Sequence, residues 1–383
     1  MSPKKKLSIT YVVGSLTIKG GMERILTEKM NALADMGRYA VCVVCVWQTE
    51  DARNAFALSP KVRQICLPPM DRQGNGRPFR QNPLGYIGRW LRNEWRQKRQ
   101  VDGILRELQT DILIAASNYV PLSFYTFRGR TIIESHCNIT ELTRVRTWPA
   151  LSMWMTRFAA RRATAVVTLT HDDAALWPSA RRVEVIPNFT CLPATAPCGY
   201  RSRRVVAVGR ICEQKGFDLL VEAWKTVTGR HPDWHLDIYG EGDQRHAVQQ
   251  QIADGGLSQV VSLHPFTTDV ASVYARAAFY VMSSRYEGFG LVLIEAMRCG
   301  LPCVSFDCAS GPSEIVTDGR DGILVPYRGL SREERIDGLA QALCRMMDHE
   351  DQLPVMGRAA QDASQRYTTG NAIPMWERLF DCL

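Results

Sequence analysis

The sequence has no apolar run that approaches the roughly 18 residues a helix needs to cross a bilayer. It also has no Asp-x-Asp triplet, so no metal site built on paired carboxylates is indicated. The first apolar stretch, 7–16, contains Thr10 and Tyr11 and lacks the small-residue cleavage pattern of an export signal. These absences favour a cytoplasmic location.

A cysteine framework is also missing, although the chain has 12 cysteines. Cys42 and Cys45 give a Cys-x-x-Cys spacing, but they lie in an apolar run typical of a strand, where residues three apart point to opposite faces. No second Cys or His pair stands at ligand spacing. We therefore expect buried, reduced thiols rather than a zinc or redox site.

What the chain does have is length and an uneven charge. Its 383 residues are too many for one core and predict two domains. The net charge is +8, from 47 basic and 39 acidic residues. Residues 1–190 hold 28 basic and 15 acidic residues, a net of +13, which leaves −5 for the remainder. The first half is expected to bind an anionic partner.

The first half follows an alternating β/α pattern. A strand at 7–13 and a loop at 14–21 precede apolar residues at helical spacing from Met22, and Gly37 ends that helix. Further strands are expected at 41–47, 112–116, 131–135 and 165–169. The tertiary arrangement of the segment 50–110 is not readable from the sequence.

The same pattern restarts after a proline-containing linker at 187–199. Strands are expected at 204–208, 235–239, 260–263, 279–283, 302–306 and 322–325. We predict an α/β protein of two Rossmann-like domains facing each other across a cleft. Their bounds are 1–190 and 191–371, and a helix at 372–383 packs back on the first domain.

Two cations stand where a strand meets a helix in the second half. The strand at 204–208 is followed by Gly209, Arg210 and Lys215, just before the next helix. Cations at the carboxyl edge of a sheet, near a helix N-terminus, suit a phosphate or diphosphate. The alternative is two solvated loop cations.

Two carboxylates flank a glycine-rich helix start further along. Glu287 follows a strand, Gly288 and Gly290 permit close backbone approach, and Glu295 lies eight residues after Glu287 inside an apolar helix. Carboxylates so spaced suit pairs of sugar hydroxyls. The alternative for Glu295 is a surface carboxylate.

A third candidate is Gly20-Gly21, between the first strand and the first helix. It lacks the G-x-G-x-x-G spacing of a dinucleotide fingerprint. A plain flexible turn is an equally good explanation.

Together these segments resemble the large GT-B glycosyltransferase family 4 of retaining, nucleotide-sugar-dependent enzymes. The resemblance covers nearly the whole chain, except for a patchy stretch at 50–110. It rests on the order of Gly20-Gly21-Met22-Glu23-Arg24, His136, Ile186-Pro187-Asn188, Arg210 with Lys215, Tyr239-Gly240-Glu241-Gly242-Asp243, Glu287 with Glu295, Ser310-Gly311-Pro312-Ser313-Glu314 and Asp318-Gly319 before Gly322.

The resemblance implies a role for each of these sites. Arg210 and Lys215 would hold the donor diphosphate, and Glu287 would contact hydroxyls of the transferred sugar. The ribose would bind Glu295, and nearby backbone amides would come from Phe289, Gly290 and Leu291.

On the acceptor side, the resemblance implies that Gly20 and Gly21 let backbone approach the phosphate and acceptor. His136 would lie beside the donor sugar, and its alternative is a satisfied core histidine. Neither a metal nor another cofactor is implied. Retention would proceed by front-face attack, with the departing phosphate accepting the proton.

A basic segment suggests a membrane surface as the anionic partner. Residues 71–100 carry eight basic and two acidic residues. Ile87, Trp90, Leu91 and Trp95 fall on one helical side, an interfacial composition. A core-packed helix with a solvated basic face is the alternative. Nucleic acid is not expected, because no nucleic-acid-reading motif accompanies the charge.

The expected function is transfer of a hexose or N-acetylhexosamine, from a donor that is preferentially UDP-linked, to a lipid-linked or polysaccharide acceptor. The enzyme would be peripheral at the inner face of the cell membrane. Two alternatives stay open: a nucleotide-sugar 2-epimerase of the same architecture, and a non-catalytic nucleotide- or glycan-binding relative.

Overall fold

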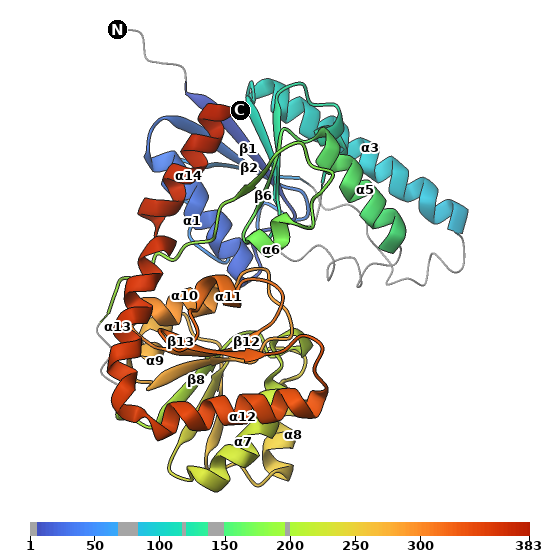
Figure 1. The fold of residues 1–383 in the computed structure, drawn as a ribbon. Helices are drawn as coiled ribbons and strands as arrows, with labels where there is room; N and C mark the ends of the chain where they lie inside the picture. Colours follow the sequence, from blue (N-terminus) through green and yellow to red (C-terminus); the bar gives the residue numbers. More distant parts are fainter. Residues whose placement is uncertain (1–5, 68–82, 117–119, 137–148, 196–199) are drawn as a thin grey trace. The chain divides into compact units, whose positions relative to one another are not determined.

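The computed structural model describes residues 6–67, 83–116, 120–136, 149–195 and 200–383. The chain divides into two compact units. Unit 1 contains residues 1–186 together with 373–383, and unit 2 contains residues 187–372 (Figure 1). Each unit is built on one parallel sheet with helices packed against it.

Unit 1 has a seven-stranded sheet in the order β3-β2-β1-β4-β5-β6-β7. Its strands are β1 (Leu7–Val13), β2 (Tyr39–Cys45), β3 (Arg63–Cys66), β4 (Ile112–Ala116), β5 (Arg130–Glu134), β6 (Ala165–Thr168) and β7 (Val183–Val185). Its helices are α1 (Gly21–Asp35), α3 (Pro83–Glu107), η1 (Leu122–Tyr125), α5 (Pro149–Arg162), α6 (His171–Ala174) and the last part of α14 (Thr369–Cys382).

The centre of this sheet is apolar on both faces, as expected where helices cover a parallel sheet. All five residues of β4 are fully buried, and β1 is buried from Ile9 onward. Helix α1 ends where Gly37 takes a φ of +69°. Helix α14 returns to unit 1, where Phe380 packs on Tyr39 with ring centroids 5.7 Å apart.

Unit 2 has a six-stranded sheet in the order β10-β9-β8-β11-β12-β13. Its strands are β8 (Arg204–Val208), β9 (His235–Tyr239), β10 (Val261–His264), β11 (Phe279–Met282), β12 (Cys303–Asp307) and β13 (Gly322–Pro326). Between and after them lie η2 (Glu213–Lys215), α7 (Phe217–Arg230), α8 (Arg245–Asp254), α9 (Val270–Ala275), α10 (Leu291–Arg298), α11 (Pro312–Ile315), α12 (Arg332–Asp348), η3 (Glu350–Gln352), α13 (Leu353–Ser364) and η4 (Gln365–Tyr367).

These two sheets confirm the expected α/β fold of two Rossmann-like domains. Each expected strand is present, with ends shifted by at most two residues. The strands that the sequence did not reveal are β3 and β7. The edge strands β3 and β7 have no fully buried residue, so they lack an apolar run. Helix α3 agrees with the helical spacing expected for Ile87, Trp90, Leu91 and Trp95, and its side toward the unit carries Glu94 and Gln97 together with the buried Val101 and Leu105.

The described cysteines are free, as expected. Cys42 and Cys45 are buried in β2, and burial raises the pKa of each thiol to about 12. Among the described residues, no group of three or more Cys, His, Asp or Glu side chains is placed to hold a metal ion.

Candidate active site

The loops after the strands of unit 2 interlock at the carboxyl edge of its sheet. The loop after β8 contacts the loop after β11 through two main-chain groups: the Arg285 amide donates to Gln214 O at 2.7 Å, and Gln214 Nε2 donates to Tyr286 O at 3.0 Å. Ser283 Oγ donates to Lys215 O at 2.9 Å. These hydrogen bonds fix the two loops relative to each other.

Glycines allow this close contact. Gly216 has a φ of +62°, and a Cβ atom there would lie 2.1 Å from Ser283 O. Gly311, in the loop after β12, has a φ of +106°, and its Cβ would lie 2.0 Å from Phe289 O. Only glycine combines a left-handed backbone with such contacts. These positions are therefore essential to the loop packing.

The interlocked loops bring Lys215 and Glu287 together. The sequence had linked these two residues only through the family resemblance. Lys215 Nζ donates to Glu287 Oε1 at 2.6 Å. Ser284 Oγ donates to the same oxygen at 2.5 Å. The Glu287 side chain is nearly buried, and the side chain of Lys215 is only 18% exposed. The Glu287 carboxylate, the Lys215 ammonium and the Ser284 hydroxyl thus form one polar cluster. The sequence did not indicate Ser284.

The main chain of Glu287 is also fixed. Its amide donates to Ala309 O at 2.8 Å, and its carbonyl accepts from the Ser310 amide at 3.0 Å. Arg210, the other expected cation, is exposed just after β8. It lies at the same sheet edge but is not part of the buried cluster.

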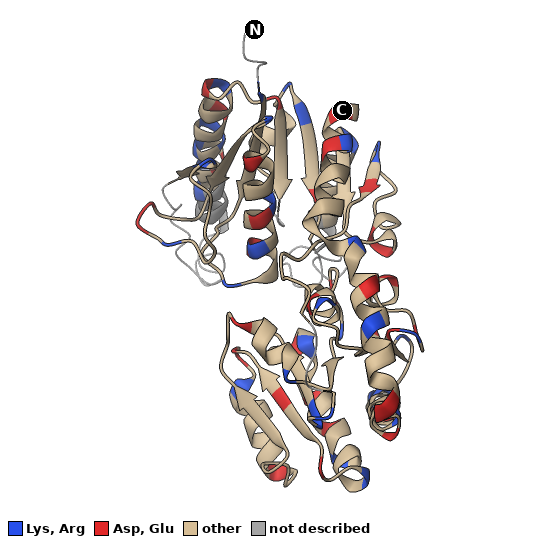
Figure 2. Cartoon of the chain, turned by 90° about the vertical axis from the view of Figure 1, so that its left-hand side faces the viewer, with Lys and Arg blue, Asp and Glu red and all other residues tan. Residues whose placement is uncertain are grey.

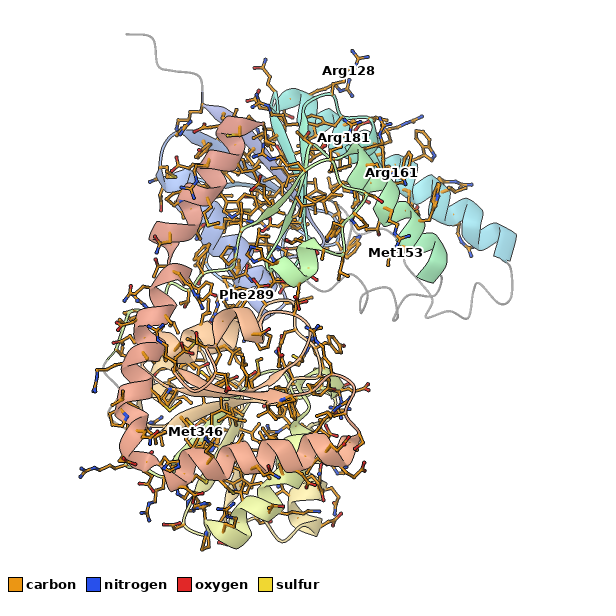
Figure 3. The ribbon with its side chains drawn as sticks, in the orientation of Figure 1. Arg128, Met153, Arg161, Arg181, Phe289 and Met346 are labelled. Carbon is orange, nitrogen blue, oxygen red and sulfur yellow. The ribbon has the colours of Figure 1, made fainter. Side chains whose placement is uncertain are left out.

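Helix α10 begins beside this cluster. Gly290 precedes its first residue with a φ of +103°, and Phe289 is buried against Tyr367, with ring centroids 5.5 Å apart (Figure 3). Glu295 lies on the second turn and is only 2% exposed, so the alternative of a surface carboxylate is wrong. The amides at the start of an eight-residue helix such as α10 offer donors and a positive dipole end to an anion.

In unit 1, the expected residues follow two different strands. Gly20 precedes α1 and Gly21 is its first residue. His136 lies two residues beyond β5, and its side chain is nearly buried. Its Nε2 atom is 3.1 Å from Glu134 Oε1, but neither ring nitrogen makes a hydrogen bond to a residue that the structure describes.

Glu134 has a second partner that the sequence did not indicate, the buried ammonium of Lys29 on α1. Burial by itself raises the pKa of Glu134, but Lys29 and His136 outweigh it and lower the pKa to about 2. Burial lowers the pKa of Lys29 despite the opposing effect of Glu134. In the sequence, Glu134 could have been noticed because it stands two residues before His136, but no signal points to Lys29.

Two family models match the chain in tandem. The glycosyl transferase 4-like domain matches residues 20–188, and the glycosyl transferases group 1 model matches residues 202–349. These ranges correspond to unit 1 and unit 2 and contain every candidate site residue named above.

Known proteins resemble the chain along much of its length. An uncharacterized glycosyltransferase of Haemophilus influenzae is 26% identical over 343 residues, which cover 86% of this chain and 89% of that protein. The poly(ribitol-phosphate) alpha-N-acetylglucosaminyltransferase of Staphylococcus aureus is 28% identical over 198 residues, 51% of this chain and 39% of that protein.

A solved structure shares the fold. Staphylococcus aureus TarM, in complex with Fondaparinux, alpha-GlcNAc-glycerol and UDP, aligns with a TM-score of 0.78 and 17% identity. The alignment covers 98% of this chain and 99% of that one. At this identity the likeness speaks for the fold alone.

Proposed function

We propose a donor, an acceptor and a location for this chain, which belongs to the GT-B glycosyltransferases of the family 4 type. It transfers a hexose or N-acetylhexosamine from a UDP-sugar to a lipid-linked or polysaccharide glycan, with retention of the anomeric configuration. The observation that carries the proposal is the cluster of Lys215, Glu287 and Ser284 next to the start of α10.

The donor diphosphate binds through Lys215, Arg210 and the first amides of α10. Lys215 donates to Glu287 in the structure described above. A diphosphate is a stronger competitor for an ammonium than one carboxylate, because it carries more negative charge. Lys215 therefore shifts toward the phosphate when donor binds, and Glu287 becomes free to accept from hydroxyls of the sugar.

The remaining contacts are those that the family resemblance implies. Glu295 faces the ribose from the second turn of α10, and Phe289, Gly290 and Leu291 supply backbone at its start. On the other unit, Gly20 and Gly21 allow close approach of acceptor or phosphate. His136 contacts a hydroxyl of the transferred sugar.

Chemistry proceeds by departure of UDP from the anomeric carbon. The C1–O bond to the β-phosphate breaks, and the acceptor oxygen bonds to C1 from the same face. The acceptor proton goes to an oxygen of the departing diphosphate. Lys215 and Arg210 stabilise the charge that develops there, so the reaction needs no metal ion.

Two named proteins support the sugar and the nucleotide. The Staphylococcus aureus relative is named as an alpha-N-acetylglucosaminyltransferase, and the TarM structure holds UDP. Both concern other proteins of low identity. They make UDP-GlcNAc and UDP-glucose the first donors to try here.

The test is a donor screen that measures release of nucleoside diphosphate, with bacterial lipid extract and polysaccharide as acceptors. We expect release with a UDP-hexose or UDP-N-acetylhexosamine, and an α-linked product by NMR when the donor is α-linked. Lys215→Met should abolish it. No release with any UDP-, GDP- or ADP-sugar favours the binding-protein alternative, and a 2-epimerised donor favours the epimerase.

We also propose that unit 1 attaches to an anionic membrane surface through α3 and α5. None of the described helices is both long and apolar enough to span a bilayer. On α3, Glu94 and Gln97 are buried, whereas Trp95 is 56% exposed and Leu91 is also exposed. The alternative of a core-packed apolar side thus does not fit these two residues. The side chains of Ile87 and Trp90 lie outside the described residues.

Helix α5 adds exposed aromatic rings to this surface. Trp154 is 63% and Phe158 is 42% exposed, and their rings stack with centroids 5.7 Å apart. Phe158 also stacks on Tyr125 of η1 at 5.8 Å. Basic residues line both helices: Arg89, Arg92, Arg96 and Arg99 on α3, and Arg157, Arg161 and Arg162 on α5 (Figures 2 and 3).

The two helices belong to one surface because η1 contacts both. Ser123 Oγ donates to Lys98 O of α3, and Arg162 of α5 donates to Tyr125 O. Exposed aromatic rings among arginines suit the headgroup boundary of an anionic bilayer.

Liposome co-sedimentation tests the membrane proposal. Binding should require anionic vesicles at low salt and fall several-fold in Trp154→Ser/Phe158→Ser. The matched control is Val355→Ser, an exposed apolar residue of unit 2. Equal recovery with neutral and anionic vesicles contradicts the proposal. Release from vesicles by added RNA instead of by salt points to nucleic acid.

A further inference from the structure

Arg285 holds both ends of the turn 213–218, which carries Lys215. Arg285 itself lies in the loop after β11. Its Nη1 atom donates to Glu213 O at 2.8 Å, at the start of the turn. At the end of the turn, Nη1 and Nη2 donate to the two carboxylate oxygens of Asp218, each at 2.8 Å. One guanidinium group therefore closes the turn from both sides of Lys215.

The main chain of Arg285 contacts the same turn. Its amide donates to Gln214 O at 2.7 Å. A Cβ atom at Gly216 would lie only 3.4 Å from Arg285 Nη1, so the guanidinium group lies directly against the turn. The Lys215 side chain leaves the turn and donates to Glu287 Oε1 at 2.6 Å. Arg285 thus fixes the backbone from which the ammonium group extends.

The pair of Arg285 and Asp218 is partly shielded from solvent, with side chains 23% and 29% exposed. Two parallel hydrogen bonds between a guanidinium and a carboxylate fix orientation as well as distance. Burial raises the pKa of Asp218, but Arg285 outweighs this effect and holds the pKa below its usual value. Asp218 also lies in the first turn of α7, where the helix dipole favours a negative charge. The pair is therefore ionised at neutral pH.

A second cation near Asp218 provides a comparison. Arg332, the first residue of α12, has its Nη2 atom 3.7 Å from Asp218 Oδ2, and its side chain is 51% exposed. At that distance the contact is an ion pair and not a hydrogen bond. Arg332 therefore adds charge beside Asp218 without the bond to Glu213 O that Arg285 makes.

We propose that Arg285 is a positioning residue for glycosyl transfer, which together with Asp218 holds the turn 213–218 so that the Lys215 ammonium lies where the donor diphosphate binds. This role rests on the proposed function, because it takes the diphosphate as the ligand of Lys215. Arg285 acts through the turn, since its terminal nitrogens are bonded to Glu213 O and Asp218. Without these bonds the turn loosens and the ammonium is misplaced.

Kinetics with a matched control test the role. A misplacement of about 1 Å can cost about 100-fold in rate, and we expect kcat/KM for the UDP-sugar to fall about 10- to 100-fold in Arg285→Met. Arg285→Lys keeps the charge, but its one nitrogen cannot make all three bonds, so it should also be slow. Arg332→Met removes a cation beside the same carboxylate and should keep the wild-type rate. A full rate in Arg285→Met, or an equal loss in Arg332→Met, overturns the proposal.

A double variant separates positioning from stability. Binding of UDP, measured by calorimetry, should weaken several-fold in Arg285→Met. If Arg285 acts through Lys215, Lys215→Met/Arg285→Met should bind UDP no more weakly than Lys215→Met alone. A damaged fold would weaken binding in both backgrounds. Losses that multiply in the double variant therefore overturn the proposal.

Chemical modification measures the position of Lys215 without any donor. The rate of acetylation by acetic anhydride is followed by mass spectrometry of chymotryptic peptides. Acetylation of Lys215 should be slow in the wild type, where Glu287 holds its ammonium group, several-fold faster in Arg285→Met and unchanged in Arg332→Met. Lys29, whose side chain is 1% exposed, should stay unmodified in every folded variant. Unchanged labelling of Lys215 in folded Arg285→Met overturns the proposal.

The two proposals fail in distinguishable ways. If no UDP-sugar supports transfer and UDP does not bind, the proposed function fails, while the labelling of Lys215 still shows whether Arg285 holds the turn. If transfer occurs and Arg285→Met keeps its rate, its UDP affinity and its Lys215 labelling, only the positioning role is lost.

Discussion

Alanine at Gly216 is expected to damage stability and turnover together. The position has a left-handed φ of +62°, and the added Cβ would lie 2.1 Å from Ser283 O. Gly319 is the matched control in the same unit, because its φ is +72° and its Cβ would meet no atom within 4 Å. Comparing the two alanine variants separates backbone strain from the steric contact.

The magnitudes follow from these distances. A left-handed alanine costs about 1 kcal/mol more than glycine once the unfolded chain is considered, and this is the whole effect expected at Gly319. At Gly216 the contact must also lengthen by about 0.9 Å, from 2.1 Å to the 3.0 Å below which Cβ contacts essentially never occur. Overpacking of this kind adds about 1–3 kcal/mol. Gly216→Ala should therefore lose about 2–4 kcal/mol of unfolding free energy.

The activity loss has a separate cause. Gly216 directly follows Lys215, and Ser283 begins the loop that carries Ser284 and Glu287. Moving either by nearly 1 Å misplaces the cluster, and a misplacement of that size can cost about 100-fold in rate.

Urea unfolding followed by tryptophan fluorescence measures the first effect, and UDP release measures the second. Gly319→Ala should keep wild-type activity. If the two variants match in unfolding free energy and in activity, the close approach of Gly216 to Ser283 does not control the site.

Four further predictions concern the charges and the donor. In Lys215→Met, Glu287 stays nearly buried without its cation, so the variant should lose about 2 kcal/mol of unfolding free energy. Its kcat/KM should fall at least about 100-fold. Lys225→Met breaks only an exposed pair with Glu222 and should change neither the unfolding free energy nor kcat/KM measurably. Glu295→Gln should raise the KM for the UDP-sugar about 10-fold and leave kcat nearly unchanged, because a ribose contact binds ground and transition states alike; a fall in kcat alone contradicts that role. The folded-state pKa of Glu134, about 2, lies below its ordinary value of 4.5. The contribution of Glu134 to stability is therefore present above pH 4.5 and is lost as the pH falls toward 2. The unfolding free energy of Lys29→Met/Glu134→Gln, measured in urea, should depend less on pH in that range than that of the wild type. EDTA should leave UDP release unchanged, and restoration of a lost rate by Mg²⁺ would refute the metal-free mechanism.

Part of the fold was readable because its signals are local. The central strands, such as 112–116 and 204–208, are continuous apolar runs, and a strand buried on both faces needs such a run wherever it lies in the sheet. The edge strands β3 and β7 were missed because partial burial imposes no such composition. Helix α3 was expected from the spacing of its apolar residues, but that spacing did not indicate that Glu94 and Gln97 are buried beside Val101 and Leu105 while Trp95 is exposed.

The candidate site divides in the same way. Glu287 and Glu295 could be singled out because their spacing, and the glycines near them, are sequence features. Ser284 could not be singled out, because nothing in its sequence context distinguishes it from other serines. Its role follows only from the position of its hydroxyl, 2.5 Å from Glu287 Oε1. Lys29 and Glu134 are 105 residues apart, and nothing in either segment indicates the other.

The sequence by itself determined the two-domain α/β architecture, the reduced state of the cysteines and the glycine and charge pattern of a family 4 type glycosyltransferase. Those properties depend on composition and on residues close together in the chain. Only the tertiary structure decided which charges meet: Lys215 with Glu287, and Lys29 with both Glu134 and Trp376. Ion pairs and close backbone contacts depend on distances of a few ångströms between distant segments, and packing sets those distances after the strands have paired.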